Sequence, residues 1–383
     1  MVQPPASRLF NSFFQGGFEC STQRLRAGRR LDVIDATAHD RFALQDYTRL
    51  REIGMQTARD GFRWHLIEQS PGEYDFRSVL PMLRAARQAD MQIIWDLCHY
   101  GWPDFVDVFS ADFPGQFGRY AAACAAVLAQ EHADAAPFVC PINELSFLTW
   151  AGDDVGYLNP FAHGRGLELK MQLVRAALRA TDELRRGLPK VRIVYAEPLL
   201  SSQCHPDRPH EAAAAGDEHL GQYQALDMLS GRLYPELGGF PEALDIVGLN
   251  YYPDNQWFFH PSLHEREHLP SGHPQHRPLS GLLAEVYARY GRPLFLSETG
   301  TEGEDRPDWL RGVMSEVRQA RAQGIPVEGV CLYPILNHAG WDDDRPCANG
   351  LWEGGGAPGE RQIYAPLLQE LRAQGLARVK HGS

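Results

Sequence analysis

The sequence predicts a closed (β/α)8 barrel, and three observations support this prediction. Eight short apolar runs of strand length alternate with segments whose apolar residues recur at helical spacing. The runs are nearly continuous in hydrophobicity, as is typical of parallel strands that are buried on both faces. Nearly every run also ends in a polar or aromatic residue, and the carboxyl ends of barrel strands are where functional sites of this fold form.

The elements follow one another in regular order. Strands are expected over residues 10–19, 56–64, 91–100, 138–144, 191–198, 245–252, 293–298 and 326–334. Helices are expected over residues 40–53 and around residues 79–86, 117–128, 173–184, 220–229, 283–290, 310–320 and 367–371. The first helix is the best defined, because Asp40 can cap its start and Gly54 follows its end. A doubly wound open sheet is the alternative, but Gly16-Gly17 lacks the third glycine and the helix of a dinucleotide-binding loop.

Length, composition and charge limit the function classes. The chain has 383 residues, of which 44% are apolar and 22% charged, and this is ordinary soluble globular composition. No linker divides it, so residues 1–383 are expected to form one catalytic barrel. The net charge of −12 argues against nucleic acid as a partner. The local basic cluster is interpreted as a solvated loop in preference to an anion site; it comprises Arg24, Arg26, Arg29 and Arg30.

Cysteine usage and apolar runs indicate the compartment. The seven cysteines show no C-x-x-C spacing, which speaks against a disulfide framework or a zinc site. Reduced thiols favour a cytoplasmic location, and the first residues lack the charged-then-apolar pattern of a signal peptide. No apolar run approaches the ~20 residues of a membrane span. We therefore expect a cytoplasmic protein without a membrane partner, and the sequence leaves its oligomeric state open.

Two of the expected strands end at a glutamate. Glu144 closes the run Pro137-Phe-Val-Cys-Pro-Ile-Asn-Glu, and Glu298 closes Pro293-Leu-Phe-Leu-Ser-Glu. On strands of one barrel, the two carboxyl groups would face each other across its mouth. Glycosidases use such a pair, in which one carboxyl attacks or activates water and the other protonates the leaving oxygen. The structural alternative for each glutamate is that it only caps the helix that follows.

The two roles require opposite environments. A nucleophile must be ionised, and Arg63 together with a tyrosine hydroxyl near Glu298 would favour that state. A general acid must hold its proton near neutral pH, so Glu144 needs a pKa raised by burial and by the charge of Glu298. Once a sugar is bonded to Glu298, that charge disappears and Glu144 can ionise to act as a base. This retaining mechanism predicts carboxyl groups about 5–5.5 Å apart.

Other residues at the strand ends suit a sugar. Asn143 is placed to donate a hydrogen bond to the 2-hydroxyl group. Trp102, Tyr333 and Trp341 can supply apolar faces for the sugar ring, although each tryptophan could equally pack in the core.

Six short motifs, in order along the whole barrel, resemble glycoside hydrolase family 1, whose members are retaining barrels with glutamates on strands four and seven. The resemblance implies β-glucosidase-like hydrolysis of O-glycosides, with Glu298 as nucleophile and Glu144 as acid/base. It also implies that Gln23 and His99 bind the sugar, that Arg63 is the strand-two arginine, and that Tyr252 contacts the nucleophile. The motifs are Phe14-Gln-Gly-Gly-Phe-Glu-Cys-Ser-Thr-Gln23, Gly61-Phe-Arg-Trp64, His99-Tyr-Gly-Trp-Pro103, Pro141-Ile-Asn-Glu144, Gly248-Leu-Asn-Tyr-Tyr252 and Leu296-Ser-Glu-Thr-Gly300.

The sequence departs from the family pattern at three positions. Leu145 replaces a proline after the acid/base, and Tyr333 stands where a tryptophan usually begins the strand-eight motif. The glutamate that grips the distal hydroxyls of the terminal sugar falls on Gly340, so that contact is lost unless Asp342 or Asp343 replaces it. The identity of the sugar is therefore open. A transglycosidase using the same site and a non-catalytic carbohydrate-binding barrel are the alternatives.

A metal-dependent hydrolase is a further alternative, because His65, Asp96, His99 and Glu197 all lie near strand ends. These four residues share neither the H-x-H nor the H-E-x-x-H spacing of metal sites. We therefore expect no metal and no cofactor.

Overall fold

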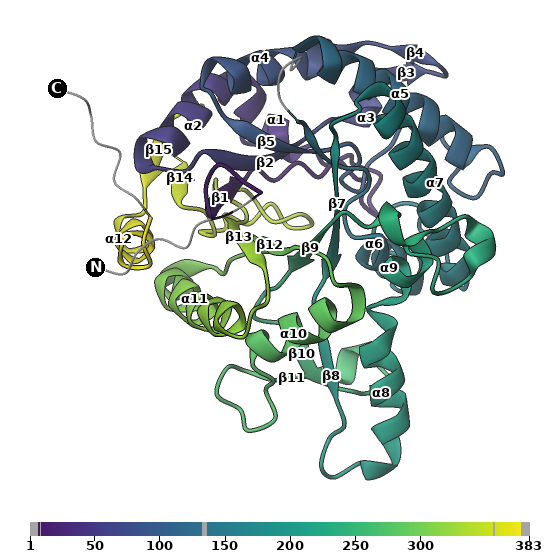
Figure 1. The fold of residues 1–383 in the computed structure, drawn as a ribbon, viewed down its shortest axis with the longest axis vertical. Coiled ribbons are helices and arrows are strands. Elements are labelled where there is room, and N and C mark those ends of the chain that lie inside the picture. The colour runs from purple at the N-terminus through teal and green to yellow at the C-terminus, as the bar shows by residue number, and fades with distance from the viewer. Residues whose placement is uncertain (1–6, 8, 132–135, 355–356, 377–383) are drawn as a thin grey trace.

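A computed structural model describes residue 7 and residues 9–131, 136–354 and 357–376, and it confirms the predicted barrel. Eight parallel strands pair in chain order, and the last pairs with the first, as Phe14 lies opposite Val330. In Figure 1 the strands run through the centre of the molecule and the helices surround them. The barrel strands are β1 (Phe14–Gly17), β2 (Thr57–Gly61), β5 (Gln92–Asp96), β6 (Phe138–Cys140), β7 (Arg192–Pro198), β9 (Ile246–Asn250), β12 (Leu294–Thr299) and β13 (Val327–Leu332).

Each barrel strand is followed by a helix, as the sequence predicts. These helices are α2 (His39–Ile53), α4 (Leu80–Gln88), α5 (Phe113–Glu131), α7 (Gly166–Gly187), α9 (Gln224–Leu229), α10 (Leu279–Tyr290), α11 (Arg306–Ala322) and α12 (Ala365–Ala373). Shorter elements decorate the connections: α1 (Val33–Ala36), α3 (Trp64–Ile67), β3 (Glu68–Ser70), β4 (Glu73–Tyr74), α6 (Leu145–Thr149), β8 (Ser201–Gln203), α8 (Ala212–Gly221), β10 (Gln256–Phe258), β11 (Glu267–His268), β14 (Trp352–Gly354) and β15 (Arg361–Ile363). Across the described ranges, none of the helices has the length and apolarity that a membrane span requires.

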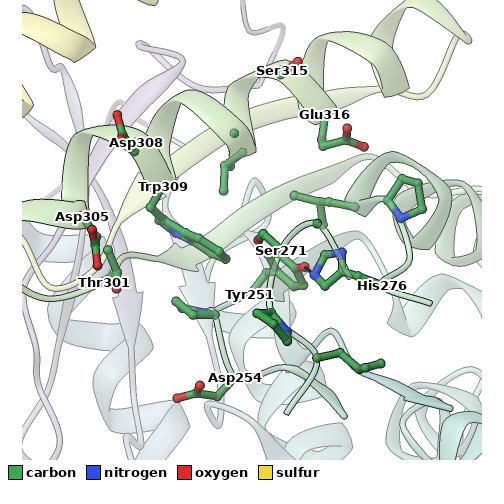
Figure 2. A pocket seen from close by; sticks show the side chains of 18 of the residues that line it. Tyr251, Asp254, Ser271, His276, Thr301, Asp305, Asp308, Trp309, Ser315 and Glu316 are labelled. Carbon is green, nitrogen blue, oxygen red and sulfur yellow. Dashed lines mark hydrogen bonds between the residues drawn. The ribbon is translucent and has the colours of Figure 1, made fainter. Parts of the chain in front are cut away.

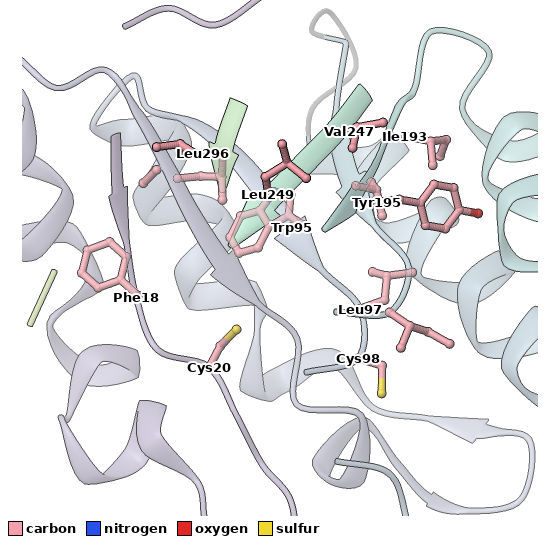
Figure 3. Close-up of a cluster of buried hydrophobic side chains, with 14 of the residues drawn as sticks. Phe18, Cys20, Trp95, Leu97, Cys98, Ile193, Tyr195, Val247, Leu249 and Leu296 are labelled. Atoms are coloured by element: carbon pink, nitrogen blue, oxygen red, sulfur yellow. The ribbon is translucent and has the colours of Figure 1, made fainter. Parts of the chain in front are cut away.

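The core has an inner and an outer layer, because side chains alternate along each strand. Ile94, Val194 and Phe295 belong to the inner cluster, into which Phe10 inserts, with its ring centroid 5.2 Å from Phe138 and 5.0 Å from Phe295. Phe10 precedes β1, so this cluster closes the amino-terminal end of the barrel. Figure 3 shows part of the other layer, which packs beneath the helices and includes Trp95, Ile193, Tyr195, Val247, Leu249 and Leu296.

Most strand ends differ from the predicted ones, and two of these differences concern the glutamates. β6 ends at Cys140, so Glu144 lies beyond the strand and adopts a left-handed backbone, with φ of 46°, just before α6. Glu298 lies inside β12, where the register against β9 shifts between Leu296 and Glu298. Such a bulge can re-aim side chains, and here it brings Ser297 and Glu298 to the same network of polar groups.

Candidate active site

Glu144 and Glu298 lie together at the carboxyl end of the barrel, where the end of β9 contacts both. Asn250 donates from Nδ2 to Glu144 Oε1 at 2.8 Å, and the Tyr252 hydroxyl donates to Glu298 Oε2 at 2.9 Å. Both glutamates are buried, with 7% and 5% of their surface exposed. The side chain of Glu144 makes no capping hydrogen bond to α6; instead the Glu197 carboxylate accepts from the Ser146 amide at 3.1 Å. The capping alternative is therefore wrong for Glu144.

A buried arginine contacts Glu298 from inside β2. The Arg59 guanidinium donates to Glu298 Oε1 at 2.7 Å, to Asp96 Oδ2 at 2.7 Å and to Asn143 Oδ1 at 2.6 Å. Arg59 is fully buried, so its positive charge acts on Glu298 with little screening by solvent. The contacts of Arg59 and Tyr252 both favour the ionised state of Glu298.

The prediction that Arg63 lies near Glu298 is wrong. The Arg63 guanidinium binds Asp32 at 3.4 Å, Asp40 at 3.0 Å and the Ser78 carbonyl oxygen at 3.2 Å. The physical reason is the length of β2, which ends at Gly61 and places Arg63 in the turn that begins α3. Arg59, four positions earlier, is the arginine that points into the barrel.

Glu144 is contacted by a side chain that the sequence analysis did not select. The Tyr100 hydroxyl donates a short hydrogen bond to Glu144 Oε2, and it accepts one from Asn143 Nδ2 at 2.9 Å. Asn143 in turn binds Arg59, so one hydrogen-bonded network joins Glu298, Arg59, Asn143, Tyr100 and Glu144.

Burial and nearby charges give the two carboxyl groups different tendencies to ionise. Burial, followed by the nearby charge of Glu298, raises the pKa of Glu144 to about 8, against the lowering effect of hydrogen bonds from Tyr100 and Asn250. Burial also raises the pKa of Glu298, but the contacting Arg59 cation opposes that rise. Among the described residues a cation contacts Glu298 and none contacts Glu144, so we assign the first ionisation of the pair to Glu298. The arrangement provides one carboxylate and one carboxylic acid near neutral pH.

The structure places most of the other predicted residues around this network. The His99 ring lies 3.1 Å from Asn143 Nδ2 through Nε2 and 3.0 Å from Asp96 through Nδ1. The Tyr333 ring is parallel to that of His99 at 6.0 Å, and the Arg59 guanidinium lies 5.4 Å from its centroid. Trp341 packs edge-on against Tyr100, with 5.9 Å between the ring centroids.

Gln23 and Trp102 are less closely tied to the pair. Gln23 is fully buried, and neither its amide nitrogen nor its amide oxygen has a hydrogen-bond partner in the described part of the chain. An unpaired buried amide is costly unless water or a ligand completes it. Trp102 is buried in the hydrophobic cluster around the barrel, as the core alternative for this tryptophan predicts.

Sequence reasoning missed Arg59, Tyr100 and Asn250, and Glu19 also lies near the site. Glu19 Oε1 accepts from the Ser21 amide at 2.9 Å and lies 3.6 Å from His99 Nε2, and its charge acts on Glu298. The available signal was the sequence Thr57-Ala-Arg-Asp-Gly61, which carries two charges inside a predicted buried strand. Charges in such a position require buried partners, and catalytic carboxylates are one kind of partner.

Gly340 lies beside the side chain of Asp343. A Cβ atom there would lie 2.2 Å from Asp343 Oδ1, so Asp343 occupies the space beside the glycine. The Asp343 carboxylate also accepts from the Arg345 amide at 3.1 Å. Asp343 is therefore the neighbouring acid at this position.

The basic cluster near the amino terminus lies on an exposed loop whose arginines bind neighbouring loops. Arg24 and Arg30 both bind Asp104, while Arg29 binds Asp344 at 3.1 Å. Arg26 donates to the carbonyl oxygens of Val155 and Gly156. These arginines join loops of the barrel rim, and residues 26–29 are exposed, in agreement with the predicted solvated loop.

One group of potential metal ligands occurs among the described residues: Cys20, Asp96 and His99, whose ligand atoms lie within 4.8 Å of one another. The group fits a metal poorly, because Arg59 donates to both oxygens of Asp96, at 3.1 and 2.7 Å. The sequence His264-Glu-Arg-Glu-His268 has the H-E-x-x-H spacing that a metal-dependent hydrolase would need. It spans a 3-10 turn and β11, however, and not the helix that would place both histidines on one face.

A separate groove of about 1030 Å³ lies on the outside of the barrel between α11 and the loop before α10 (Figure 2). Tyr251 and Trp309 stack within it, with ring centroids 5.7 Å apart. Neither catalytic candidate lines this groove. Tyr251 thus points away from the glutamates, whereas Tyr252 contacts Glu298 as the resemblance implied.

Comparison with known proteins identifies the fold. No known family pattern and no curated protein matches the sequence. The β-glycosidase from Thermosphaera aggregans superimposes with a TM-score of 0.78 at 16% identity, over 97% of this chain and 97% of that chain. The β-glucosidase from Thermotoga maritima in complex with glucoimidazole gives a TM-score of 0.80 at 14% identity, over 98% of this chain and 100% of that chain.

The chain has the fold of the β-glycosidases. A third structure, described as a family 1 β-glucosidase from Thermotoga maritima, agrees, with a TM-score of 0.76 at 15% identity over 95% of this chain and 98% of that chain. At this level of identity the likeness confirms the fold that the sequence motifs implied. Activity and residue roles must be argued from the site itself.

Proposed function

We propose that this chain is a retaining β-glycosidase that hydrolyses O-glycosidic bonds by double displacement, with Glu298 as nucleophile and Glu144 as acid/base. The observation that carries the proposal is the pair of buried glutamates in opposite environments. Glu298 accepts hydrogen bonds from Arg59 and Tyr252, while burial and the charge of Glu298 raise the pKa of Glu144 to about 8. This division of roles is what glycoside hydrolysis by two carboxyl groups needs.

In the first step the Glu298 carboxylate attacks the anomeric carbon of a β-glycoside, and the bond from that carbon to the leaving oxygen breaks. Glu144 gives its proton to the leaving oxygen, so the aglycone departs as a neutral alcohol. The ester that forms removes the negative charge of Glu298. Because that charge helps to raise the pKa of Glu144, its loss favours the ionised form of Glu144.

In the second step Glu144 takes a proton from water, whose oxygen attacks the anomeric carbon and releases Glu298. Two inversions give net retention of configuration. Asn143, Gln23, His99, Tyr333 and Trp341 are proposed to bind the sugar, whereas Trp102 packs in the core. Arg59 takes the place that the sequence assigned to Arg63, and Tyr252 holds the nucleophile.

The test is a panel of aryl β-glycosides, beginning with β-glucosides, because the Thermotoga maritima neighbour is a β-glucosidase. Glu298→Ala should abolish hydrolysis, and added azide should restore turnover as an α-glycosyl azide. Glu68→Gln is the matched control, since Glu68 is a buried glutamate that binds Trp64 and Gly72 away from the pair. Unimpaired hydrolysis by the Glu298 variant would reject the assignment. Release from no glycoside would favour the carbohydrate-binding alternative.

The proposed setting is the cytoplasm, with a carbohydrate as partner and residues 1–383 acting as one catalytic barrel. The seven cysteines are unpaired, which agrees with a reducing compartment.

A further inference from the structure

The Tyr100 hydroxyl contacts the proposed acid/base directly. Tyr100 lies just beyond β5, only 2% of its surface is exposed, and its hydroxyl makes a short hydrogen bond to Glu144 Oε2. Its backbone is left-handed, with φ of 65°, a conformation that non-glycine residues adopt at a cost. A strained, buried tyrosine in contact with a catalytic carboxyl suggests a role in the reaction.

The direction of this hydrogen bond is fixed by its neighbours. Arg59 can only donate, and it lies 2.6 Å from Asn143 Oδ1, so the Asn143 amide nitrogen faces the other way. That nitrogen lies 2.9 Å from the Tyr100 oxygen and must donate to it. The hydroxyl proton of Tyr100 is therefore directed to Glu144. A chain of donors thus starts at Arg59 and ends on the acid/base.

The second oxygen of Glu144 is held in the same way. Ser297 Oγ donates to Asn250 Oδ1 at 2.6 Å, which turns the Asn250 amide nitrogen toward Glu144 Oε1 at 2.8 Å. Gly248 makes room for this arrangement, because a Cβ atom there would lie 2.5 Å from Ser297 Oγ. Both carboxyl oxygens thus accept from oriented donors, and such bonds stabilise the carboxylate over the acid.

Packing keeps Tyr100 in place. Its ring lies 4.6 Å from His99, 5.3 Å from Phe147 and 5.9 Å from Trp341, measured between centroids. Its carbonyl oxygen accepts from Asn159 Nδ2 at 3.0 Å. The hydroxyl is therefore held against Glu144 from the ring and from the backbone, so the donor is preorganised.

We propose that Tyr100 is a positioning residue that orients Glu144 and favours its ionised form, so that one carboxyl group serves as acid in the first step and as base in the second. The role in turnover rests on the proposed function, but the effect on Glu144 does not. Burial and the charge of Glu298 oppose ionisation, and Tyr100 and Asn250 favour it. The other titratable groups that face Glu144 or Tyr100 include Glu19, His99, Glu197, Tyr157 and Tyr252.

The direct test is a titration of Glu144 in the full-length protein. With 13C-labelled glutamate carboxyl groups, the Glu144 resonance is the one lost in Glu144→Gln. Tyr100→Phe should raise the pKa of Glu144 by about one pH unit, because a carboxylate loses one charge-assisted hydrogen bond. Tyr195→Phe is the matched control, since Tyr195 is equally buried and its hydroxyl bonds Thr181 on the outer side of β7. A Tyr100→Phe titration equal to wild type, or shifted to lower pH, overturns the proposal.

A second measurement covers the case in which Tyr100→Phe does not fold. In wild-type protein with 13Cζ-labelled tyrosine, one ring resonance should change in Glu144→Gln and should titrate together with the Glu144 carboxyl. A tyrosine spectrum that is flat through the Glu144 titration overturns the proposal.

Kinetic measurements test whether the effect of Tyr100 on Glu144 also affects the rate of hydrolysis. With a 2,4-dinitrophenyl β-glycoside, whose leaving group needs no acid, Tyr100→Phe should lower kcat about tenfold through the base-assisted second step. Its kcat/KM should change much less, and azide should restore kcat by replacing water as the nucleophile. A protein that cleaves no glycoside but shows the titration shift refutes the proposed function alone. A protein that cleaves glycosides, with wild-type titration and kcat in Tyr100→Phe, refutes the role of Tyr100 alone.

Discussion

The Arg59 guanidinium reaches the Glu298 carboxylate from inside β2, with 2.7 Å between donor nitrogen and Oε1. The same guanidinium binds Asp96 and Asn143, so three polar groups depend on its planar shape. Lysine keeps the charge but not the fork of donors. We expect Arg59→Lys to lower kcat/KM for an aryl glycoside by about 100-fold, because the buried carboxylate loses a well-oriented partner.

Arg63→Lys is the matched control for this prediction. Arg63 is also buried, but it binds Asp32 and Asp40. We expect its kcat/KM to stay within about threefold of wild type, while the Tm falls by a few degrees. Circular dichroism would establish that both variants are folded. A larger loss of kcat/KM in Arg63→Lys than in Arg59→Lys would return the role to position 63.

The dependence of kcat/KM on pH should show that the two carboxyl groups ionise at different pH values. Glu144 must be protonated to act as the acid, and burial together with the charge of Glu298 raises its pKa to about 8. We therefore expect kcat/KM to fall above about pH 8. In Glu298→Gln the neighbouring charge is absent, so the pKa of Glu144 should drop, as measured by carboxyl 13C titration. An unchanged titration of Glu144 in this variant would contradict the coupling.

The barrel could be predicted from the sequence because its strands are apolar on both faces. Runs such as Gln92–Asp96 and Ile246–Asn250 can be recognised as strands from the sequence alone. The two glutamates could also be predicted, since each follows such a run. Because all strands of the barrel are parallel, two residues at the carboxyl ends of their strands lie at the same end of the barrel. This position alone does not give the mechanism.

The supporting residues could not be predicted, for physical reasons that differ. Arg59 sits within a strand, and its burial is tolerable only because Asp96, Asn143 and Glu298, distant in sequence, surround it. Tyr100 follows a strand, but its direction is set by a left-handed backbone that no local pattern specifies. The prediction for Arg63 was wrong because the sequence does not show at which residue β2 ends and the following turn begins.

Glu19 provides a test of how the nucleophile is tuned. Burial is the largest cause that raises the pKa of Glu298; Arg59 opposes it, and the negative charge of Glu19 adds to it. Replacing Glu19 with glutamine removes that charge while keeping the shape of the side chain. The pKa of Glu298 should fall, so the acidic limb of the kcat/KM profile should move to lower pH. Movement to higher pH would show that Glu19 acts on the site by another route.

The protonation of His39 should make the stability of the folded protein depend on pH. Its Nδ1 lies 2.9 Å from Asp46 and its Nε2 lies 2.8 Å from Asp60, so both ring nitrogens face carboxylates. Burial lowers its pKa, but Asp60 and Asp46 more than offset that effect and raise the pKa from 6.5 to about 9. The folded protein therefore holds this proton more tightly than the unfolded chain.

The sign of the stability effect follows from that difference. The stabilisation by protonated His39 is fully present below pH 6.5 and is lost as the pH rises to about 9, and it amounts to about 3 kcal/mol. We expect urea unfolding to show His39→Gln to be less stable than wild type at pH 6, with a gap that narrows toward pH 9. His210→Gln, at an exposed histidine, is the control for the loss of a surface imidazole. A gap that widens with pH would mean that His39 is held neutral between its two aspartates.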